Sequence, residues 1–201
     1  RAAMSGNGLR CLAHAVAMET AAGAVSLQIE TDAGLRNVTV DGDGPDVTGS
    51  VDMGVVGLGP TIPAALVSEL GSTRAGTGDV GNPHLVVCVE DPTTVDLAAV
   101  GASYESHFPD GMNVEFIAPA PGEPNAIDLR VWERGAGITE ACGTGATASA
   151  ALAAAWGLVG RDVTVHMAGG DVRVLVDERA TLVGPSTYVA TIQWSATWDA
   201  A

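Results

Sequence analysis

Lysine is absent from this 201-residue sequence, and all nine of its basic residues are arginine. Pyridoxal-phosphate enzymes hold their cofactor through a lysine Schiff base, so this chain alone is not one of them. The Walker-type phosphate loop also needs a lysine, which excludes that kind of nucleotide site. The 24 acidic residues bring the formal net charge to −15. Such a charge balance argues against nucleic-acid binding, which requires clustered basic residues.

Aromatic residues are also scarce, at 4 %, although hydrophobic residues together make up 47 % of the chain. That apolar fraction, combined with only 16 % charged residues, excludes a wholly disordered chain and predicts a folded core. The length suits one large domain or two small ones. No apolar run reaches the roughly 18 residues of a membrane-spanning helix, so we expect no membrane association.

Cysteine is infrequent, with only Cys11, Cys88 and Cys142 in the chain. The odd number and the lack of a Cys-x-x-Cys motif argue against a disulfide framework and against a zinc site. The chain opens without a basic-then-apolar signal peptide, so we expect a cytoplasmic protein that holds no metal. Cys88 lies in an apolar run and Cys11 inside a predicted helix, so both are expected to be packing residues.

Periodicity and turn residues predict an α+β protein with few helices and many, mostly antiparallel, strands. Two Ala-rich helices are predicted over 6–20 and 143–156, a further helix over 94–106, and a helical turn near 63–70. The rest of 54–80 is Gly-rich and is expected to be irregular. The predicted strands cover 25–31, 34–40, 49–53, 84–90, 113–118, 126–132, 162–167, 172–177, 180–184 and 187–194.

Two similar turns precede the Ala-rich helices, Ser5-Gly-Asn-Gly8 and Cys142-Gly-Thr-Gly145. A small-residue turn entering a helix exposes free backbone N–H groups, which together with the helix dipole form an anion site. The same field lowers the pKa of a thiol, so we expect Cys142 to favour the thiolate. If both ends faced one carboxylate, one side chain would deprotonate the adjacent carbon while the other reprotonated its opposite face. The alternative is that both turns are simple helix caps.

Further polar residues lie at the ends of predicted strands. Glu133 and Arg134 would hold a zwitterionic group, or they form a solvated surface pair. Asn82 and His84 flank a proline, which is typical of a turn. Alternatively, His84 tunes acid–base chemistry at the site. Asn113 enters another strand, either as a neutral hydrogen-bonding ligand or as a turn residue.

Taken in chain order, eight segments resemble the diaminopimelate epimerase family. They are Met4-Ser-Gly-Asn-Gly-Leu-Arg-Cys11, Val51-Asp-Met-Gly54, Gly81-Asn-Pro-His-Leu-Val-Val87, Asn113-Val-Glu-Phe116, Glu133-Arg-Gly-Ala-Gly137, Ala141-Cys-Gly-Thr-Gly-Ala146, Gly169-Gly-Asp-Val-Arg-Val174 and Leu182-Val-Gly-Pro185. The set covers nearly the whole chain, and eight matches in order are far more specific than any one of them. The family's start is missing, so we expect a chain truncated at its N-terminus.

The resemblance implies a pseudo-symmetric two-domain fold in which each half is a curved sheet around a central helix. Residues 1–50 would be the remnant of the N-terminal domain, with 188–201 returning to it, and 51–187 would be the C-terminal domain. The implied protein is a homodimeric isomerase that needs no cofactor. It interconverts LL- and meso-diaminopimelate, a small amino-acid substrate, for lysine and peptidoglycan biosynthesis.

The resemblance also implies roles for individual residues, motif by motif. Cys142 would be one catalytic acid/base, and His84 and Glu133 would assist the catalytic thiols. Backbone groups would hold the reacting carboxylate, at Gly6, Asn7, Gly143 and Thr144. Side chains would bind the distal amino-acid end of the substrate, at Asn82, Asn113, Glu133 and Arg134.

The sequence departs from the family at Ser5, where the first motif normally carries a second catalytic cysteine. A hydroxyl is a much weaker acid than a thiol, and therefore a poor base near neutral pH. Three interpretations stay open: a natural variant that still epimerises with help from a neighbouring base or water, an engineered substitution, or a binding protein that no longer inverts. A one-thiol relative resembling the proline-racemase-like dehydratases is a fourth. Cys11 lies more than one helical turn beyond Ser5, which makes it a poor substitute.

Overall fold

The computed structural model describes residues 4–193. Its helices are α1 (Gly6–Thr20), α2 (Ala64–Leu70), α3 (Leu97–Ser106) and α4 (Gly143–Ala155), with one 3₁₀ turn, η1 (Pro92–Thr94). The strands are β1 (Ala24–Thr31), β2 (Gly34–Asp41), β3 (Asp46–Gly54), β4 (Gly57–Leu58), β5 (Ala75–Asp79), β6 (Pro83–Cys88), β7 (Asn113–Pro119), β8 (Ala126–Glu133), β9 (Gly137–Thr139), β10 (Asp162–His166), β11 (Val172–Val176) and β12 (Ala180–Thr187). Within this part of the chain, no helix is long and apolar enough to cross a membrane.

All the described strands belong to one sheet, in the order β1-β2-β3-β12-β11-β10-β8-β7-β6-β5-β4, with β9 paired to β8. Neighbouring strands run antiparallel except in two pairs, β6 with β7 and β8 with β10. The predicted α+β class, with mostly antiparallel strands, is therefore confirmed.

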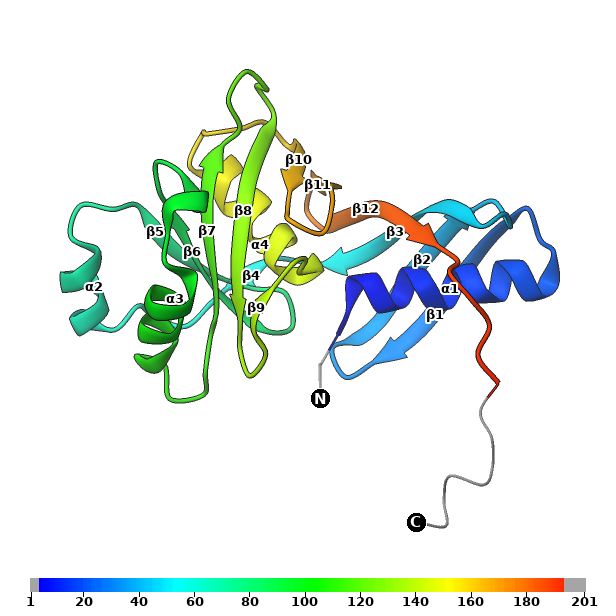
Figure 1. The fold of residues 1–201 in the computed structure, drawn as a ribbon, viewed down its shortest axis with the longest axis horizontal. Helices are drawn as coiled ribbons and strands as arrows, with labels where there is room; N and C mark the ends of the chain where they lie inside the picture. Colours follow the sequence, from blue (N-terminus) through cyan, green and yellow to red (C-terminus); the bar gives the residue numbers. More distant parts are fainter. Residues whose placement is uncertain (1–3, 194–201) are drawn as a thin grey trace, which may run out of the picture.

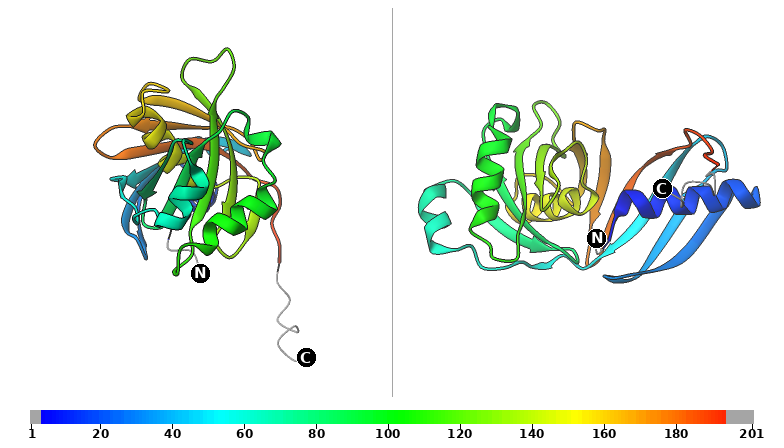
Figure 2. Two further views of the ribbon diagram at one scale, coloured as in Figure 1. Left: turned by 90° about the vertical axis from the view of Figure 1, so that its left-hand side faces the viewer. Right: turned by 60° about the horizontal axis from the view of Figure 1, so that its bottom comes forward.

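The sheet is divided between two parts of the molecule, as Figure 1 shows. In the first part, α1 packs on β1, β2 and β3. In the second part, the strands curve around α4, which Figure 2 shows enclosed by them. The paired strands β3 and β12 run from one part to the other. Because β3 continues without a break through residues 50 and 51, the domain division at that point stays a prediction.

Helix α4 is buried because its side chains are small. Its sequence is GTGATASAALAAA, and nine of its thirteen residues are buried. Gly76 and Gly78 of β5 face it, and a Cβ on Gly78 would lie 3.5 Å from the Cβ of Ala148. An all-round apolar helix of this kind is stable only inside a core. The small residues let the surrounding strands approach closely and place the start of α4 deep in the fold.

A second layer explains the apolar run of β6. Leu85 and Val87 pack with Phe116 and the helices α2 and α3 in one hydrophobic cluster, whereas Val86 belongs to the cluster around α4. Because both faces of β6 are covered, the strand has almost no polar positions. On the neighbouring β7, the same alternation directs Glu115 toward the α4 side.

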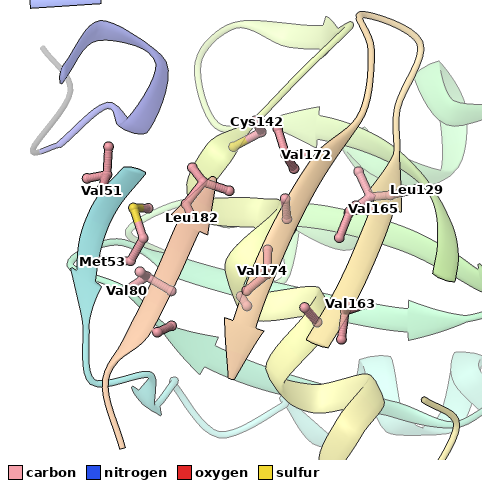
Figure 3. Packing of buried hydrophobic residues seen from close by; sticks show 14 of the residues in the cluster. Val51, Met53, Val80, Leu129, Cys142, Val163, Val165, Val172, Val174 and Leu182 are labelled. Carbon is pink, nitrogen blue, oxygen red and sulfur yellow. The ribbon is translucent and has the colours of Figure 1, made fainter. Parts of the chain in front are cut away.

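Leu182 of β12 lies in the core where the two parts meet. Figure 3 shows it beside Val51 and Met53 of β3 on one side and Val172 of β11 on the other, with Cys142 nearby. Val51 is its partner in the antiparallel pairing of β3 with β12. This packing brings the starts of α1 and α4 to the same region of the molecule.

Several predicted elements were wrong in detail. The strands expected at 180–184 and 187–194 are one strand, β12, that passes through Pro185 and ends at Thr187. Residues 188–193 form no strand, and residue 194 lies outside the described residues. The strands β4, β5 and β9 were not predicted, because they are short and β5 contains two glycines (AGTGD). The helical turn near 63–70 is confirmed as α2.

The returning tail enters the first part of the molecule at Tyr188. Its backbone N–H donates to the carbonyl of Pro45 at 2.7 Å. The remainder of the segment expected to return, 194–201, lies outside the described residues.

Candidate active site

Ser5 and Cys142 are equivalent N-caps of α1 and α4. Ser5 has φ −138° and ψ 110°, and its Oγ accepts a hydrogen bond of 3.1 Å from the backbone N–H of Gly8. Cys142 has φ −133° and ψ 110°, and its Sγ accepts one of 3.3 Å from the N–H of Gly145. The two turns therefore have the same local structure, built from the same pattern of small residues.

The two helix starts meet tip to tip around Leu182. A Cβ added at Gly6 would lie 2.7 Å from Leu182 Cδ2, and one at Gly143 would lie 2.9 Å from the same atom. The Gly143 Cβ would also be 3.6 Å from the Cα of Gly6. Both contacts with leucine are closer than real Cβ atoms approach, so a side chain at the first residue of either helix would have to displace the buried Leu182.

A cavity of about 440 Å³ opens at this junction. It is lined by Met4, Ser5, Gly6, Asn7, Asn82, Asn113, Glu133, Arg134, Gly135, Ala136, Ala141, Cys142, Gly143 and Thr144. The structure thus brings together every predicted site residue except His84, which lies fully buried behind the wall. Within residues 4–193, the backbone N–H groups of Gly6, Asn7, Gly143 and Thr144 form no hydrogen bond. Four free donors at two helix N-termini suit a carboxylate.

The protonation state of Cys142 differs from the prediction. Burial, together with the negative charges of Glu115 and Glu133, raises the pKa of its thiol from an ordinary 9.0 to about 12. Hydrogen bonds from Thr144 and the N–H of Gly145 lower the pKa, but by less. The prediction that Cys142 favours the thiolate is therefore wrong for the site without substrate, because burial raises the pKa by more than the field of the helix lowers it.

Asn82 connects the cavity to a buried acid–base pair. Its Nδ2 donates to Thr144 Oγ1 at 3.3 Å, and its Oδ1 lies 3.1 Å from His84 Nε2. His84 Nδ1 lies 2.6 Å from Glu115 Oε1, and neither side chain is exposed. Burial raises the pKa of Glu115, although the nearby His84 opposes the rise.

Sequence reasoning missed Glu115. The available signal was a carboxylate in the middle of an otherwise apolar strand, where a charged residue is rarely buried without a partner. Gly145 makes room for it: a Cβ there would lie 2.6 Å from Glu115 Oε1 and 3.3 Å from Cys142 Sγ. The carboxyl group therefore lies directly beneath the start of α4.

Asn113 holds the opposite wall of the cavity together. Its Nδ2 donates to the carbonyl of Pro83 at 2.9 Å, and its Oδ1 accepts from the backbone N–H of Arg134 at 3.0 Å. The Arg134 guanidinium is exposed and donates to the carbonyl of Asp110 at 3.0 Å. Glu133, which is half-buried, accepts a short hydrogen bond from Thr139.

Arg10 supports the first helix tip and was also missed from the sequence. It is only 4 % exposed, and its Nη2 donates to Asn7 Oδ1 at 3.0 Å. Cys11 beside it is exposed, so its expected packing role was wrong; only one face of α1 is covered by the sheet. Cys88 packs against the core as predicted.

Comparison with known proteins identifies relatives over most of the chain. The family model described as Diaminopimelate epimerase matches residues 77–189. A diaminopimelate epimerase of Desulfitobacterium hafniense is 38 % identical over 202 residues, covering 92 % of this chain and 71 % of its own length. That of Moorella thermoacetica is 40 % identical over 203 residues, covering 92 % and 72 %.

Solved structures share the fold at lower identity. A hydroxyproline epimerase from Agrobacterium vitis, with bound trans-4-hydroxy-L-proline, superposes with a TM-score of 0.65 at 21 % identity, over 92 % of this chain and 65 % of that one. A probable proline racemase from Agrobacterium radiobacter gives 0.67 at 18 % identity, over 98 % and 70 %. The fold is thus that of the amino-acid epimerases and racemases. Within that class, the chain belongs to the diaminopimelate epimerase family, whose named members are isomerases.

Proposed function

We propose that this protein interconverts LL- and meso-2,6-diaminopimelate by removing and returning the α-proton. The observation that carries the proposal is the shared cavity. Ser5 and Cys142, each the N-cap of a helix, both line the space where the two helix tips meet. A carbon held there has a proton-carrying side chain available from each helix, which suits inversion next to a bound carboxylate.

The reacting carboxylate binds at the helix tips. The free N–H groups of Gly6, Asn7, Gly143 and Thr144 donate to its oxygens, and both helix dipoles favour the negative charge. The substrate is a zwitterion, so the chain's net charge of −15 gives it no long-range attraction. Local donors therefore supply the binding energy, and they stabilise the additional charge that develops when the α-proton leaves.

In one direction, Cys142 as thiolate accepts the α-proton, and the electron pair of the broken C–H bond stays on carbon. The Ser5 hydroxyl gives its proton to the opposite face of that carbon, and the alkoxide then takes a proton from water. Water reaches Ser5 because this residue is exposed. The hydroxide that remains accepts the thiol proton of Cys142, which restores the starting state. The reverse reaction follows the same steps backwards.

The distal end of the substrate carries its own amine and carboxylate. We place it against the wall formed by Asn82, Asn113, Glu133 and Arg134, which supplies groups of both charges within the same cavity. Arg134 is suited to the carboxylate, because a guanidinium pairs with two oxygens at once. Glu133 is suited to the ammonium group.

The test is proton exchange in D₂O with the full-length protein and LL-diaminopimelate. We expect deuterium at the α-carbon and formation of the meso isomer, both lost in Cys142→Ala. Binding without exchange would identify a protein that captures the amino acid without inverting it. Exchange without the meso isomer would show one-sided chemistry, and loss of water from a substrate would support a dehydratase.

The serine at position 5 supports the alternative that the protein does not invert its substrate. A hydroxyl at this position donates a proton but is a poor base near neutral pH. A binding protein takes up the amino acid without exchange. A one-thiol relative exchanges the α-proton only from the Cys142 side, so its LL-diaminopimelate keeps its configuration. The inverting protein instead incorporates solvent deuterium from the Ser5 side.

We also propose a cytoplasmic location and a homodimer. The three cysteines are unpaired, as is usual in a reducing compartment. The dimer is supported only by the family. Light scattering of the full-length protein during size-exclusion chromatography tests it, and a monomeric mass would overturn it.

A further inference from the structure

A chain of four hydrogen bonds runs from buried Glu115 to the sulfur of Cys142. Glu115 Oε1 lies 2.6 Å from His84 Nδ1, and His84 Nε2 lies 3.1 Å from Asn82 Oδ1. Asn82 Nδ2 donates to Thr144 Oγ1 at 3.3 Å, and Thr144 Oγ1 lies 3.4 Å from Cys142 Sγ. None of these links depends on a substrate.

The chemistry of each group fixes the direction of the chain. Because the Asn82 oxygen only accepts, the proton in the next link must belong to His84 Nε2. Glu115 keeps that proton on Nε2, because it shares a second proton with Nδ1. Either Glu115 is a carboxylic acid that donates to Nδ1 of a neutral imidazole, or it is a carboxylate that accepts from Nδ1 of an imidazolium. Both forms leave the second nitrogen of His84 protonated.

The far end of the chain follows from the same rule. Thr144 Oγ1 already accepts from Asn82, so its single proton is free to point at the sulfur. If His84 carried its proton on Nδ1 instead, the Asn82 amide would turn round and Thr144 would donate to Asn82. Cys142 would then lose a donor.

We propose that the Thr144 hydroxyl is a fixed hydrogen-bond donor to Cys142, and that Glu115 sets its direction from the other end of the chain. Both are positioning residues, and this role of the Thr144 side chain is separate from that of its backbone N–H. The inference rests on the proposed function, in which Cys142 must become a thiolate. Burial favours the protonated thiol. A hydrogen-bond donor aimed at the sulfur favours the thiolate and so opposes part of this effect, and the Thr144 side chain lowers the pKa of Cys142 in this way.

The first test substitutes Thr144 and measures the rate at which Cys142 is alkylated, by peptide mass spectrometry. T144V keeps the shape but removes the hydroxyl, and T144S retains it as the matched control. A hydrogen bond to a thiolate is worth roughly one pKa unit, and the higher nucleophilicity of a more basic thiolate offsets part of the loss. We expect T144V to react about threefold more slowly than the wild type, and T144S to react at the wild-type rate.

Two alkylating reagents of different size separate thiolate content from access. A lower thiolate fraction slows both reagents by the same factor, whereas a narrower entrance slows the larger one more. An unchanged rate in T144V, or a fall confined to the larger reagent, would overturn the donor role. Thermal unfolding of both variants checks that the fold is retained.

The second test reads the direction of the chain in the unmodified protein. Nitrogen NMR of His84 distinguishes the two tautomers, and we expect the proton on Nε2. A neutral His84 with its proton on Nδ1 would reverse the chain and overturn the role of Glu115. Neither test needs a substrate, so a failure here is distinct from a failure of the D₂O exchange experiment.

Discussion

Ser5 and Cys142 share one backbone geometry but lie in different environments. Their φ angles are −138° and −133° and both ψ angles are 110°, yet Ser5 is exposed and Cys142 is only 6 % exposed. In the proposed reaction, the two faces of the substrate carbon would therefore meet a hydroxyl open to water on one side and a shielded thiol on the other.

Replacing Ser5 with cysteine should preserve or raise the rate of α-proton exchange. A thiol is a far stronger acid than a hydroxyl, and its sulfur would occupy the same capping position above Gly8. The initial rate of meso-diaminopimelate formation in D₂O measures the effect, with Ser5→Ala as the control that removes the proton donor. A large fall in Ser5→Cys would mean that the hydroxyl has a role that sulfur does not fulfil.

The stability of the protein should fall between about pH 9 and pH 12 because of Cys142. In the folded state the pKa of this thiol is raised to about 12 from an ordinary 9.0, mainly by burial. Below pH 9 both states keep the proton, so the shift has no effect. Above pH 9 the unfolded state loses the proton first, which lowers the free energy of unfolding by up to roughly a few kcal/mol.

Urea unfolding of the wild type and Cys142→Ala at pH 8.5 and at pH 11 checks this sign. Other groups titrate in both proteins, so the difference between them isolates the thiol. The wild type should lose more stability than the variant on going to pH 11. Equal losses would contradict a buried, protonated Cys142.

Gly145→Ala should destabilise the protein and disturb the site together. The new Cβ would lie 2.6 Å from Glu115 Oε1, and such overpacking typically costs about 1–3 kcal/mol. Gly23→Ala is the matched control, because nothing lies within 4 Å of a Cβ there and its effect should be within about 0.5 kcal/mol. Chemical denaturation compares the two, and equal stabilities would show that Glu115 moves aside freely.

Arg134→Gln should weaken substrate binding more than it slows the chemical step. Arg134 lines the cavity but is exposed, and we propose that it binds the distal carboxylate rather than a group at the reacting carbon. Loss of a charge-assisted pair predicts a KM at least about tenfold higher, with a smaller change in kcat. The reverse pattern, an unchanged KM with a low kcat, would place Arg134 at the reacting centre.

Much of the fold could be predicted because its signals are local. The Ala-rich helices follow small-residue turns, and the alternating strands such as β1 and β2 show a clear two-residue period. The errors arose where tertiary contacts override local preference. Pro185 suggested a break, but β12 continues through it, paired with Thr48 of β3. The Gly-rich β5 forms because its glycines fit against α4.

The position of the candidate site could be predicted from the sequence, but its electrostatics could not. Motif order places Ser5, Cys142 and the polar wall in one cavity, and the structure brings them together. The helix-start argument for a thiolate failed because the sequence does not report burial. Glu115 was missed for a related reason, because its partner His84 lies on another strand. Arg10 was missed because the sequence does not show that its side chain is buried between Asn7 and the carbonyl of Pro185.

Leu182 packs against the starts of both helices that carry Ser5 and Cys142. Its Cδ2 methyl lies close to both helix-start glycines, so the volume of one interior leucine limits how closely the two helix starts approach. In the proposed reaction, the placement of the two proton-carrying side chains is thereby tied to hydrocarbon packing. A change of a single methylene on β12, unremarkable elsewhere in the core, would alter the distance over which a hydrogen must travel.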